Sequence, residues 1–405
     1  MSESVNEISS AGWTKVTLGE IAGNISENDY NPKEKGLDHC VGLEHLDPGS
    51  LKIRRWLPIT PEMSFTRRFS KGQILFGKRR AYQKKVALAD FDGICSSDIL
   101  VIEAKKENFV PELLPFIIQD DRFFEYAVGT SSGSLSPRTK WKFLADYEIS
   151  LPSIDEQRHI ATALWAAEDC IIKGERFIAT AEQGKRVLMR ELFSRGIGHT
   201  EFKETKIGRL PVQWNVKHLQ EVANVNPESS DPTLIPNKKF LYVDIESVEN
   251  GTGVIKSAKE MFGKDAPSRA RRIIKENDVI MSQVRPYLKA FAIISERFND
   301  QICSTGFAVL RSKEEINTKF LFNLLFSDLV MNQCNQMMVG SQYPAINDNQ
   351  VKMLQIPIPP LPEQRQIAGI LTRCDETIAA ARANVVAAKA LKMKMINEML
   401  SQKGE

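Results

Sequence analysis

The chain has 405 residues, which is enough for two or three domains of ordinary size. Its 42% hydrophobic and 26% charged residues are typical of a soluble protein, and the net charge of +3 neither requires nor excludes a nucleic-acid partner. No apolar run reaches the ~18 residues of a membrane span. The polar start MSESVNEISS does not resemble a signal peptide, so we expect a cytoplasmic protein with no membrane partner.

The cysteines form no CxxC pair, so we expect buried free thiols in a reducing compartment. A short cluster of His39, Cys40 and His45 has no equivalent in the second half of the chain, and we expect no metal site there. The six cysteines are Cys40, Cys95, Cys170, Cys303, Cys334 and Cys374.

One stretch occurs twice. It reads LPSIDEQRHIATALWAAEDCI from Leu151 and IPPLPEQRQIAGILTRCDETI from Ile358, with the Glu-Gln-Arg elements 207 residues apart. Each copy opens on prolines and continues into a helical pattern. The spacing of Ser153 and Glu156 suits a capping box, and Pro362 suits the first turn of a helix.

After each Glu-Gln-Arg element, apolar or small residues recur at alternating spacings of four and three, the a/d pattern of a coiled coil. Both patterns have a lysine at the same point, Lys185 and Lys392. We therefore predict two long helices that pair antiparallel. The alternative is that each helix packs on its own domain, but a helix of roughly 40 residues, about 60 Å long, exceeds one small domain. The first pattern is Ile160, Leu164, Ala167, Ile171, Gly174, Ile178, Ala181, Leu188 and Leu192, and the second lies 207 residues later.

The rest of each half also repeats, from Trp13 and from Trp214, as short alternating strands and turns followed by short helices. We predict an α/β (α+β) fold, a pseudo-two-fold tandem repeat in which an antiparallel coiled coil separates two mixed α/β domains. The predicted segments are a first mixed α/β domain at 1–152, a central long helix at 153–197, a second mixed α/β domain at 198–359 and a C-terminal long helix at 360–405.

Catalytic motifs are missing from the sequence. No GxGxxG follows a strand and there is no GxxxxGK[ST], so we expect neither a nucleotide nor a methyl-donor site in this chain. Asp90 or Asp98 with Glu103 and Lys105 loosely resembles a nuclease site. The second half has Leu310-Arg311-Ser312 instead, without the carboxylate, so we expect no catalytic residues.

Two basic and aromatic loops in each half are the candidate functional sites. Arginine and lysine neutralise phosphates, arginine can also bind guanine with two hydrogen bonds, and glutamine can bind adenine in the same way. The alternative is a charged hairpin on a solvated face. The predicted DNA-binding residues are Lys78, Arg79, Arg80, Tyr82, Lys84, Ser134, Arg138 and Lys140 in the first half, and Gln283, Arg285, Tyr287, Lys289, Gln342 and Tyr343 in the second. Ser341 shares the last loop, and nearby arginines are further candidates for phosphate contacts: Arg67, Arg68, Arg269, Arg271 and Arg272.

The paired Pro…Glu-Gln-Arg-x-Ile helix starts, joined to two divergent domains that each open on a tryptophan, resemble the DNA-specificity subunit of type I restriction-modification systems. The resemblance covers nearly the whole chain. It implies two recognition domains that each read one half of a split double-stranded DNA site, with the helices as a fixed spacer. It also implies two methyltransferase subunits and restriction/translocase subunits as partners, which would hold S-adenosylmethionine, ATP and Mg²⁺.

Four side chains off the seam are candidates for partner contacts or extra core: Trp165, Ile172, Phe177 and Phe193. Two other interpretations stay open. One is a coiled-coil adaptor that joins proteins without reading DNA sequence. The other is a self-contained nuclease, which would need a metal-carboxylate site that the sequence does not display.

Overall fold

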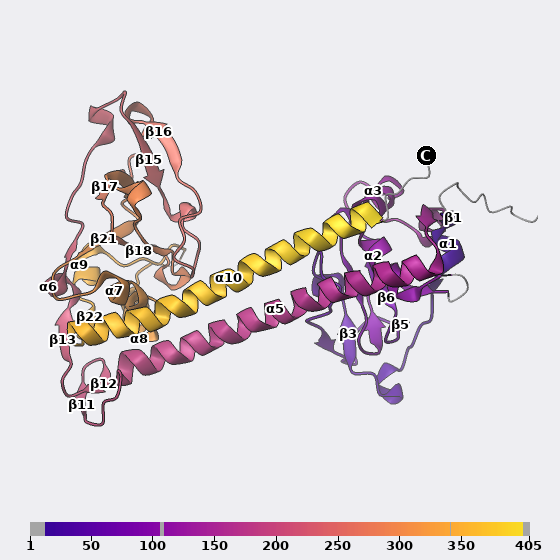
Figure 1. The fold of residues 1–405 in the computed structure, drawn as a ribbon, viewed down its shortest axis with the longest axis horizontal. Helices are drawn as coiled ribbons and strands as arrows, with labels where there is room; N and C mark the ends of the chain where they lie inside the picture. Colours follow the sequence, from indigo (N-terminus) through magenta and orange to yellow (C-terminus); the bar gives the residue numbers. More distant parts are fainter. Residues whose placement is uncertain (1–12, 106–108, 341, 400–405) are drawn as a thin grey trace, which may run out of the picture. The chain divides into compact units, whose positions relative to one another are not determined.

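The computed structural model describes residues 13–105, 109–340 and 342–399. The chain divides into two compact units. Unit 1 holds the residues up to Glu175 and those from Ala383 onward, and unit 2 holds Arg176–Arg382. Two long helices, α5 (Ile154–Arg195) and α10 (Leu361–Met399), each contribute one part to either unit (Figure 1).

Unit 1 contains two four-stranded sheets. The strands of the first run in the order β2-β9-β6-β7 and are all antiparallel. The second has the order β4-β3-β8-β5, with β3 and β8 parallel. The bounds are β2 (Ala22–Ile25), β3 (His39–Val41), β4 (Leu57–Pro58), β5 (Arg67–Phe69), β6 (Ile74–Gly77), β7 (Val86–Leu88), β8 (Gly93–Cys95) and β9 (Ile99–Ala104).

Unit 2 repeats this topology. Its sheets have the orders β14-β21-β18-β19 and β16-β15-β20-β17, with β15 and β20 parallel. The matched topology confirms the predicted tandem repeat of mixed α/β units. The bounds are β14 (Ala223–Val225), β15 (Lys239–Val243), β16 (Lys259–Phe262), β17 (Ala270–Ile274), β18 (Val279–Ser282), β19 (Phe291–Ile293), β20 (Gln301–Ser304) and β21 (Phe307–Ser312).

Short helices and a closing strand pair complete each unit. The pairs are β1 (Thr14–Thr17) with β10 (Glu148–Leu151), and β13 (Asn215–His218) with β22 (Gln355–Ile358). A hairpin of β11 (Phe202–Thr205) and β12 (Gly208–Pro211) follows α5. The short helices are α1 (Leu18–Ile21), α2 (Leu114–Gln119), α3 (Asp121–Gly129), α4 (Trp141–Leu144), α6 (Leu219–Val222), α7 (Thr318–Leu325), α8 (Asp328–Met337) and α9 (Asp348–Lys352).

The main core of each unit lies between a sheet, the short helices, the start of one long helix and the end of the other. In unit 1, Phe76, Phe116 and Leu164 are fully buried in one cluster. In unit 2, Phe193 is 2% exposed and its ring centroid lies 5.5 Å from that of Phe320. Phe193 is therefore a core residue and not a free partner contact, and burying a side chain of this size stabilises the fold by about 1.5–3 kcal/mol.

The long helices pair antiparallel within each unit. In unit 1, Glu175 pairs with Lys389 at 2.8 Å, and Glu168, lower on α5, pairs with the higher-numbered Lys392 at 2.7 Å. In unit 2, the later α5 residue Lys185 pairs with the earlier α10 residue Asp375 at 2.5 Å. The predicted seam residues are buried or half-buried wherever their side chains are described; that of Met399 lies outside the described residues.

The two lysines that interrupt the seam are equivalent in the repeat but differ in burial. Lys392 is 2% exposed and donates to Glu168 and to Oε1 of Gln119, 3.0 Å away. Its counterpart Lys185 pairs with Asp375, whose side chain is 42% exposed. A buried polar pair in an apolar seam is a known means of fixing helix register.

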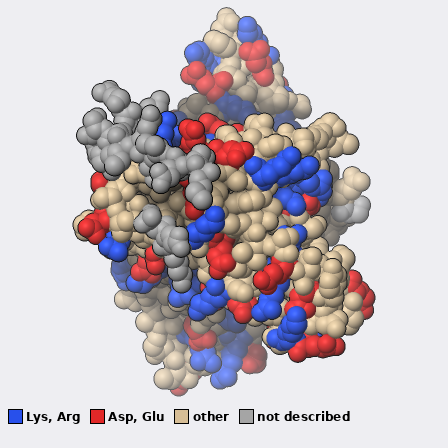
Figure 2. Space-filling view, turned by 90° about the vertical axis from the view of Figure 1, so that its right-hand side faces the viewer, with Lys and Arg blue, Asp and Glu red and all other residues tan. Residues whose placement is uncertain are grey.

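Charges are mixed on the surface. Figure 2 shows one face on which Lys and Arg are interspersed with Asp and Glu, as the small net charge leads one to expect. Among the cysteines, Cys170 is exposed and Cys374 half-buried, so the expectation of buried thiols is wrong for these two and correct for the other four. Both lie on the long helices, which are only partly covered. Within the described ranges, no helix is long and apolar enough to cross a membrane.

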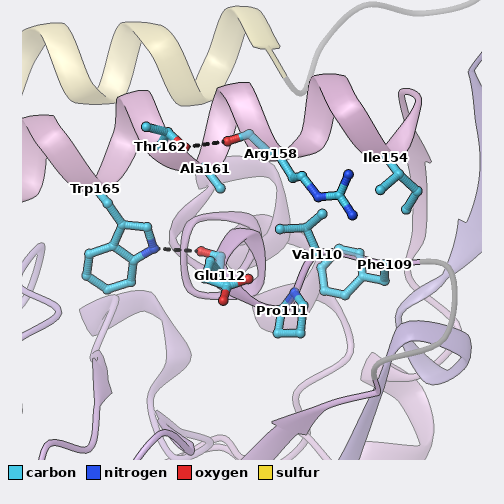
Figure 3. A pocket seen from close by; sticks show the side chains of 9 residues that line it. All are labelled: Phe109, Val110, Pro111, Glu112, Ile154, Arg158, Ala161, Thr162 and Trp165. Atoms are coloured by element: carbon cyan, nitrogen blue, oxygen red, sulfur yellow. Dashed lines mark hydrogen bonds between the residues drawn. The ribbon is translucent and has the colours of Figure 1, made fainter.

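The Glu-Gln-Arg element joins each long helix to its unit through its buried glutamine. Gln157 accepts from the backbone N–H of Val110 at 3.0 Å and donates to the carbonyl of Pro152 at 2.9 Å. Gln364 accepts from Asn317 N–H at 2.8 Å and donates to Pro359 at 2.8 Å, so the same anchor occurs twice. In unit 1 the Trp165 indole also donates to the Glu112 carbonyl, 2.9 Å away (Figure 3).

The glutamate of the second copy fastens the segment that follows α5. One carboxylate oxygen of Glu363 accepts from Ile197 N–H and contacts His199 Nε2, both at 2.9 Å. The other accepts from the indole N–H of the buried Trp214 at 2.9 Å. The Glu-Gln-Arg element therefore has a structural role: its glutamine anchors each long helix, and Glu363 also holds the segment after α5.

Candidate nucleic-acid interface

The duplicated Arg-x-Tyr-x-Lys motif forms the same turn in both units. It places a short 3-10 helix between two sheet strands, η3 (Ala81–Gln83) between β6 and β7, and η8 (Pro286–Leu288) between β18 and β19. The flanking basic residues all have positive φ: 54° at Arg80, 51° at Lys84, 47° at Arg285 and 55° at Lys289.

These four residues carry backbone strain. Left-handed geometry costs a side-chain-bearing residue about 1–2 kcal/mol, except that Asn and Asp tolerate it better. The other non-glycine residues with positive φ in the described chain are Asn226, Asn277 and Asp300. Strain of this kind gathers at functional sites, and here it recurs at the same motif positions in both units.

The two predicted loops of each unit lie against one another. Arg80 N–H donates to the Pro137 carbonyl at 2.8 Å, and Arg285 N–H donates to the Pro344 carbonyl at the same distance. One step away, Thr139 N–H donates to the Lys78 carbonyl at 3.1 Å. The loops thus form one surface per unit, which we call the recognition surface: 78–84 with 134–140 in unit 1, and 283–289 with 342–348 in unit 2.

In unit 1 this surface is organised around Asp98, at the turn between β8 and β9. Its carboxylate accepts from Arg79 at 3.2 Å and from Arg138 at 2.8 Å. Burial alone would raise the pKa of Asp98, but the hydrogen bonds from the two arginines outweigh it and lower the pKa. Asp98 therefore stays ionised and holds one arginine from each loop.

The cations outnumber this carboxylate. Burial lowers the pKa of Lys78, and the nearby charge of Arg67 lowers it further. Arg79 and Arg80 both donate to Oγ of Ser136, at 3.0 and 3.4 Å, while their buried Nε atoms have no partner among the described residues. Crowded, incompletely paired cations favour an anionic ligand such as a phosphate.

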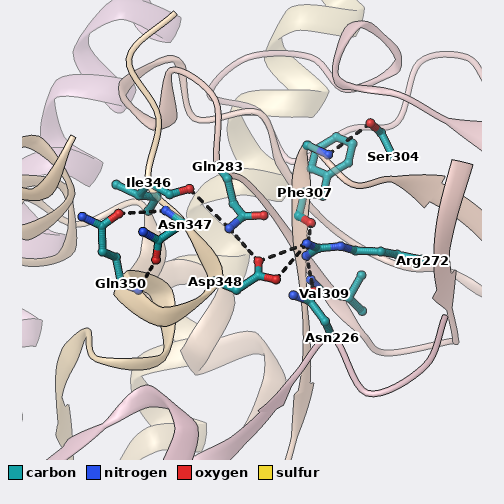
Figure 4. A network of polar contacts seen from close by, with 11 residues as sticks. Asn226, Arg272, Gln283, Ser304, Phe307, Val309, Ile346, Asn347, Asp348 and Gln350 are labelled. Atoms are coloured by element: carbon teal, nitrogen blue, oxygen red, sulfur yellow. Dashed lines mark hydrogen bonds and ion pairs between the residues drawn. The ribbon is translucent and has the colours of Figure 1, made fainter. Parts of the chain in front are cut away.

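In unit 2 the equivalent surface has a closed network (Figure 4). Arg272 on β17 donates to both oxygens of Asp348, at 3.0 and 3.1 Å, and also contacts the Asn226 side chain. Gln283 is 5% exposed and donates to Asp348 at 2.8 Å and to the Ile346 carbonyl at 3.3 Å.

The network changes the role of two candidates. Both amide hydrogens of Gln283 are engaged, so it positions the second loop instead of presenting its amide to a base. Arg272 is held in the ion pair with Asp348 and is not free for a phosphate. Burial opposes ionisation of Asp348, but the hydrogen bonds from Arg272 and Gln283 lower its pKa.

The exposed part of the unit 2 surface is formed by Arg285 and Tyr343. The guanidinium lies 4.6 Å from the ring centroid of Tyr343, which is 68% exposed, and donates to the Gln342 carbonyl at 3.0 Å. Tyr287 is exposed, as is its counterpart Tyr82 in unit 1. A planar cation on an exposed ring is suited to contacts with bases or sugars.

Of the remaining predicted DNA-binding residues, two lysines bind partners within their own unit and two residues of the second loop are exposed. Lys84 pairs with Asp121 on α3 at 2.5 Å, and Lys289 donates to the Phe326 carbonyl at 2.7 Å, so both are turned toward the short helices. Ser134 and Lys140 are exposed on the second loop. Ser341 lies outside the described residues.

The sequence did not identify the side chains that organise these surfaces. From the sequence, Asp98 is a candidate only for the nuclease-like site, and Ser136 and Asp348 carry no signal of their own. One usable signal was the match of Pro137 with Pro344, which marks the loop beside each strained turn. Within the described ranges, no three or more His, Cys, Asp or Glu side chains group as a metal site would require.

Comparison with known proteins places the chain in one family. The family model described as type I restriction modification DNA specificity domain matches twice, at residues 11–177 and 211–387. The type I restriction enzyme MjaVIII specificity subunit of Methanocaldococcus jannaschii is 25% identical over 82% of this chain and 76% of its own length. The EcoDI specificity subunit of Escherichia coli is 24% identical over 58% of this chain and 56% of its own.

Solved structures have the same fold. The S subunit of a type I restriction-modification system from M. genitalium superposes with a TM-score of 0.59, covering 97% of each chain at 14% identity. A chain from a study of type I system assembly and conformational transition superposes with a TM-score of 0.56 at 22% identity, covering 97% of this chain and 99% of its own. With the tandem units, the paired helices and the two family matches, the chain belongs to the family of type I restriction-modification DNA specificity subunits.

Proposed function

We propose that this subunit recognises a bipartite double-stranded DNA site, with one half read by the recognition surface of each unit. The observation that supports this most strongly is the pair of strained turns, which share one backbone and carry different side chains. A constant frame with variable side chains suits two readers of unlike sequences. In unit 1 the cations would chiefly bind phosphates, and in unit 2 Arg285 and Tyr343 would contact bases.

The paired helices α5 and α10 set the gap between the two half-sites in this proposal. At about 1.5 Å per helical residue, one heptad adds roughly 10 Å, or about three base pairs. Inserting a heptad into both helices, at matched seam positions, should lengthen the gap by that amount. A methylation assay that finds an unchanged gap would contradict the spacer role.

The chemistry would be supplied by partners. We propose that two methyltransferase subunits bind this chain, that restriction/translocase subunits join them, and that the complex acts in the cytoplasm. S-adenosylmethionine, ATP and Mg²⁺ would belong to those subunits. The family match gives no support to the alternative of an adaptor that does not read DNA.

The direct test is to map modified bases in cells that express this chain with its methyltransferase. One split motif of fixed gap should account for the modified sites. Binding of the purified chain to that DNA should weaken steeply from low to moderate salt, because phosphate contacts release counterions. Binding that hardly responds to salt, with no common motif, would favour the adaptor.

A further inference from the structure

In unit 2, one carboxylate holds two side chains that come from different strands. Asp348 accepts from the guanidinium of Arg272 at 3.0 and 3.1 Å and from the amide of Gln283 at 2.8 Å (Figure 4). Arg272 also contacts the side-chain oxygen of Asn226. The donors that converge at this point therefore find their acceptors within unit 2.

The same two donor positions carry two cations in unit 1. Arg67 of β5 and Arg272 of β17 are equivalent, because each is paired with the cysteine of the strand beside it. Lys78 and Gln283 are equivalent, because the backbone carbonyl of each accepts an N–H of the second loop, at 3.1 and 3.0 Å respectively. Unit 1 therefore has a guanidinium and an ammonium where unit 2 has a guanidinium and a neutral amide.

The acceptors of unit 2 are missing from unit 1. Asp348 is the first residue of α9, and the first residue of the equivalent helix α4 is Trp141, at the repeat spacing of 348 − 141 = 207. Ile25 is the fourth residue counted from the start of β2, and Asn226 is the fourth counted from the start of β14. Both acceptors of Arg272 thus have apolar side chains in their place in unit 1.

The two cations of unit 1 have no carboxylate of their own. Within the described ranges, Arg67 forms no ion pair: its Nη1 lies 3.5 Å from the Ile25 carbonyl, and its buried Nε has no partner. Lys78 Nζ likewise has no partner there, and the carboxylate of Asp98 is occupied by the two arginines of the loops. Burial and the charge of Arg67 lower the pKa of Lys78, so the two cations are close together. Half-buried charges without a counterion are unfavourable, and an anion from outside would stabilise both.

We propose that Arg67 and Lys78 bind one phosphate group of the DNA backbone, in the place that the Asp348 carboxylate has in unit 2. A guanidinium can bind two phosphate oxygens at once, and an ammonium binds phosphate as a point charge. The ligand completes the recognition surface of unit 1, whereas that of unit 2 is complete without one. This site deepens the proposed function and rests on it, since unit 1 must bind a half-site for the phosphate to reach these cations.

The first test replaces single phosphates of the unit 1 half-site by neutral methylphosphonates and measures binding of the full-length chain. One replacement should weaken binding by the wild type about tenfold. The same replacement should have no effect on Lys78→Gln, which carries the residue of unit 2 at this position. Lys71→Gln is the matched control, because Lys71 is an exposed lysine before the start of β6 and Lys78 follows its end. It should respond as the wild type does.

The second test supplies the missing carboxylate within the chain. Trp141→Asp should pair with both cations and exclude the phosphate, and Trp141→Asn is its control, since it loses the same indole but adds no charge. Trp141→Asp should bind DNA about tenfold more weakly than Trp141→Asn, with a salt slope lower by about 1. Without DNA it should unfold at the higher temperature of the two. Equal affinities, salt slopes and unfolding temperatures would overturn the assignment, and if neither variant folds, the methylphosphonate comparison decides.

The outcomes separate this site from the proposed function. If the wild-type chain binds its DNA site but no methylphosphonate distinguishes it from Lys78→Gln, the phosphate site falls alone. If the wild-type chain binds no DNA site, both fall. Inorganic phosphate is the probe for a free anion. If it raises the unfolding temperature of the wild type but not of Lys78→Gln, and no position of the DNA is coupled to Lys78, the assignment to the DNA backbone is overturned.

Discussion

The two recognition surfaces share a backbone and differ in electrostatics. In unit 1, one carboxylate, Asp98, faces several cations from both loops. In unit 2 the position of Asp98 is taken by Gly306, and the loops are held by Arg272 and Asp348 in a neutralised network. The equivalence is fixed by backbone hydrogen bonds, since Lys78 N–H donates to Asp98 and Gln283 N–H donates to Gly306.

The difference shows which part of the repeat is constrained. Both units have the strained turn and its backbone hydrogen bond to the second loop. The ion pairs that hold the loops differ between the units, with Asp98 in unit 1 and Arg272–Asp348 in unit 2. A surface of this design can change its ligand by side-chain replacement without moving its backbone. The seam lysines show the same contrast, because Lys392 is buried with its partner and Lys185 pairs with a half-exposed one.

The largest effect should come from the seam lysines. Lys392→Met leaves Glu168 buried without a counterion and should lower the free energy of unfolding by about 3–5 kcal/mol. Lys185→Met leaves the half-exposed Asp375 and should cost less than about 1 kcal/mol. Urea unfolding followed by circular dichroism measures both. The double variant Lys392→Met with Glu168→Met should recover most of the loss. Equal losses from Lys392→Met and Lys185→Met would show that the burial of the two lysines does not decide their contribution to stability.

The carboxylates of Asp348 and Asp98 should also differ in how much they stabilise the fold, with the larger contribution from the one whose arginine partner is more buried. Asp348→Ala leaves Arg272, whose side chain is 11% exposed, without its carboxylate and should cost about 2–3 kcal/mol. Asp98→Ala leaves Arg79 and Arg138, which are 37% and 48% exposed and can regain water, so the cost should stay below about 1 kcal/mol. Thermal unfolding measures the stability of both variants. A larger loss of stability from Asp98→Ala than from Asp348→Ala would contradict this order.

The arginines of the strained turns should affect recognition more than stability. Arg285→Ala should weaken DNA binding by about 1–3 kcal/mol and relax specificity at one position if the side chain reads a base. Arg80→Ala, its counterpart, should weaken binding to all sequences alike and reduce the salt slope by about 1. Competition binding with single-base variants of the site measures both, and identical profiles would show that the surfaces do not differ in their mode of contact.

The smallest effect should be that of pH. Asp98 and Asp348 both have a pKa lowered by their arginine partners. Their contribution to stability is therefore complete above the unfolded pKa near 3.9 and is lost as the pH falls through the lower folded value. The difference in unfolding free energy between wild type and the two alanine variants should be constant from pH 8 to pH 5 and shrink below about pH 4. A decline already near pH 6 would point to other groups.

The repeat made much of this structure predictable from the sequence. The 207-residue match located both long helices, their antiparallel pairing and the lysines in the seam, and the Arg-x-Tyr-x-Lys motif located both turns. The side chains that hold the loops together were not predictable, because Asp98 lies on the turn between β8 and β9 and Arg272 lies on β17, both outside the loops that they hold. Positive φ at arginine and lysine is set by tertiary packing and has no local signal. Gln283 resembled a base reader because the sequence does not show that its amide donates to Asp348 and to the Ile346 carbonyl.

The most direct test of two independent readers is to replace residues 205–355 with the corresponding segment of another specificity subunit and to map the modified bases. We predict that the half-site read by unit 1 and the length of the gap stay unchanged, while the other half-site takes the sequence of the donor. A change in both half-sites, or in the half read by unit 1 alone, would contradict the account.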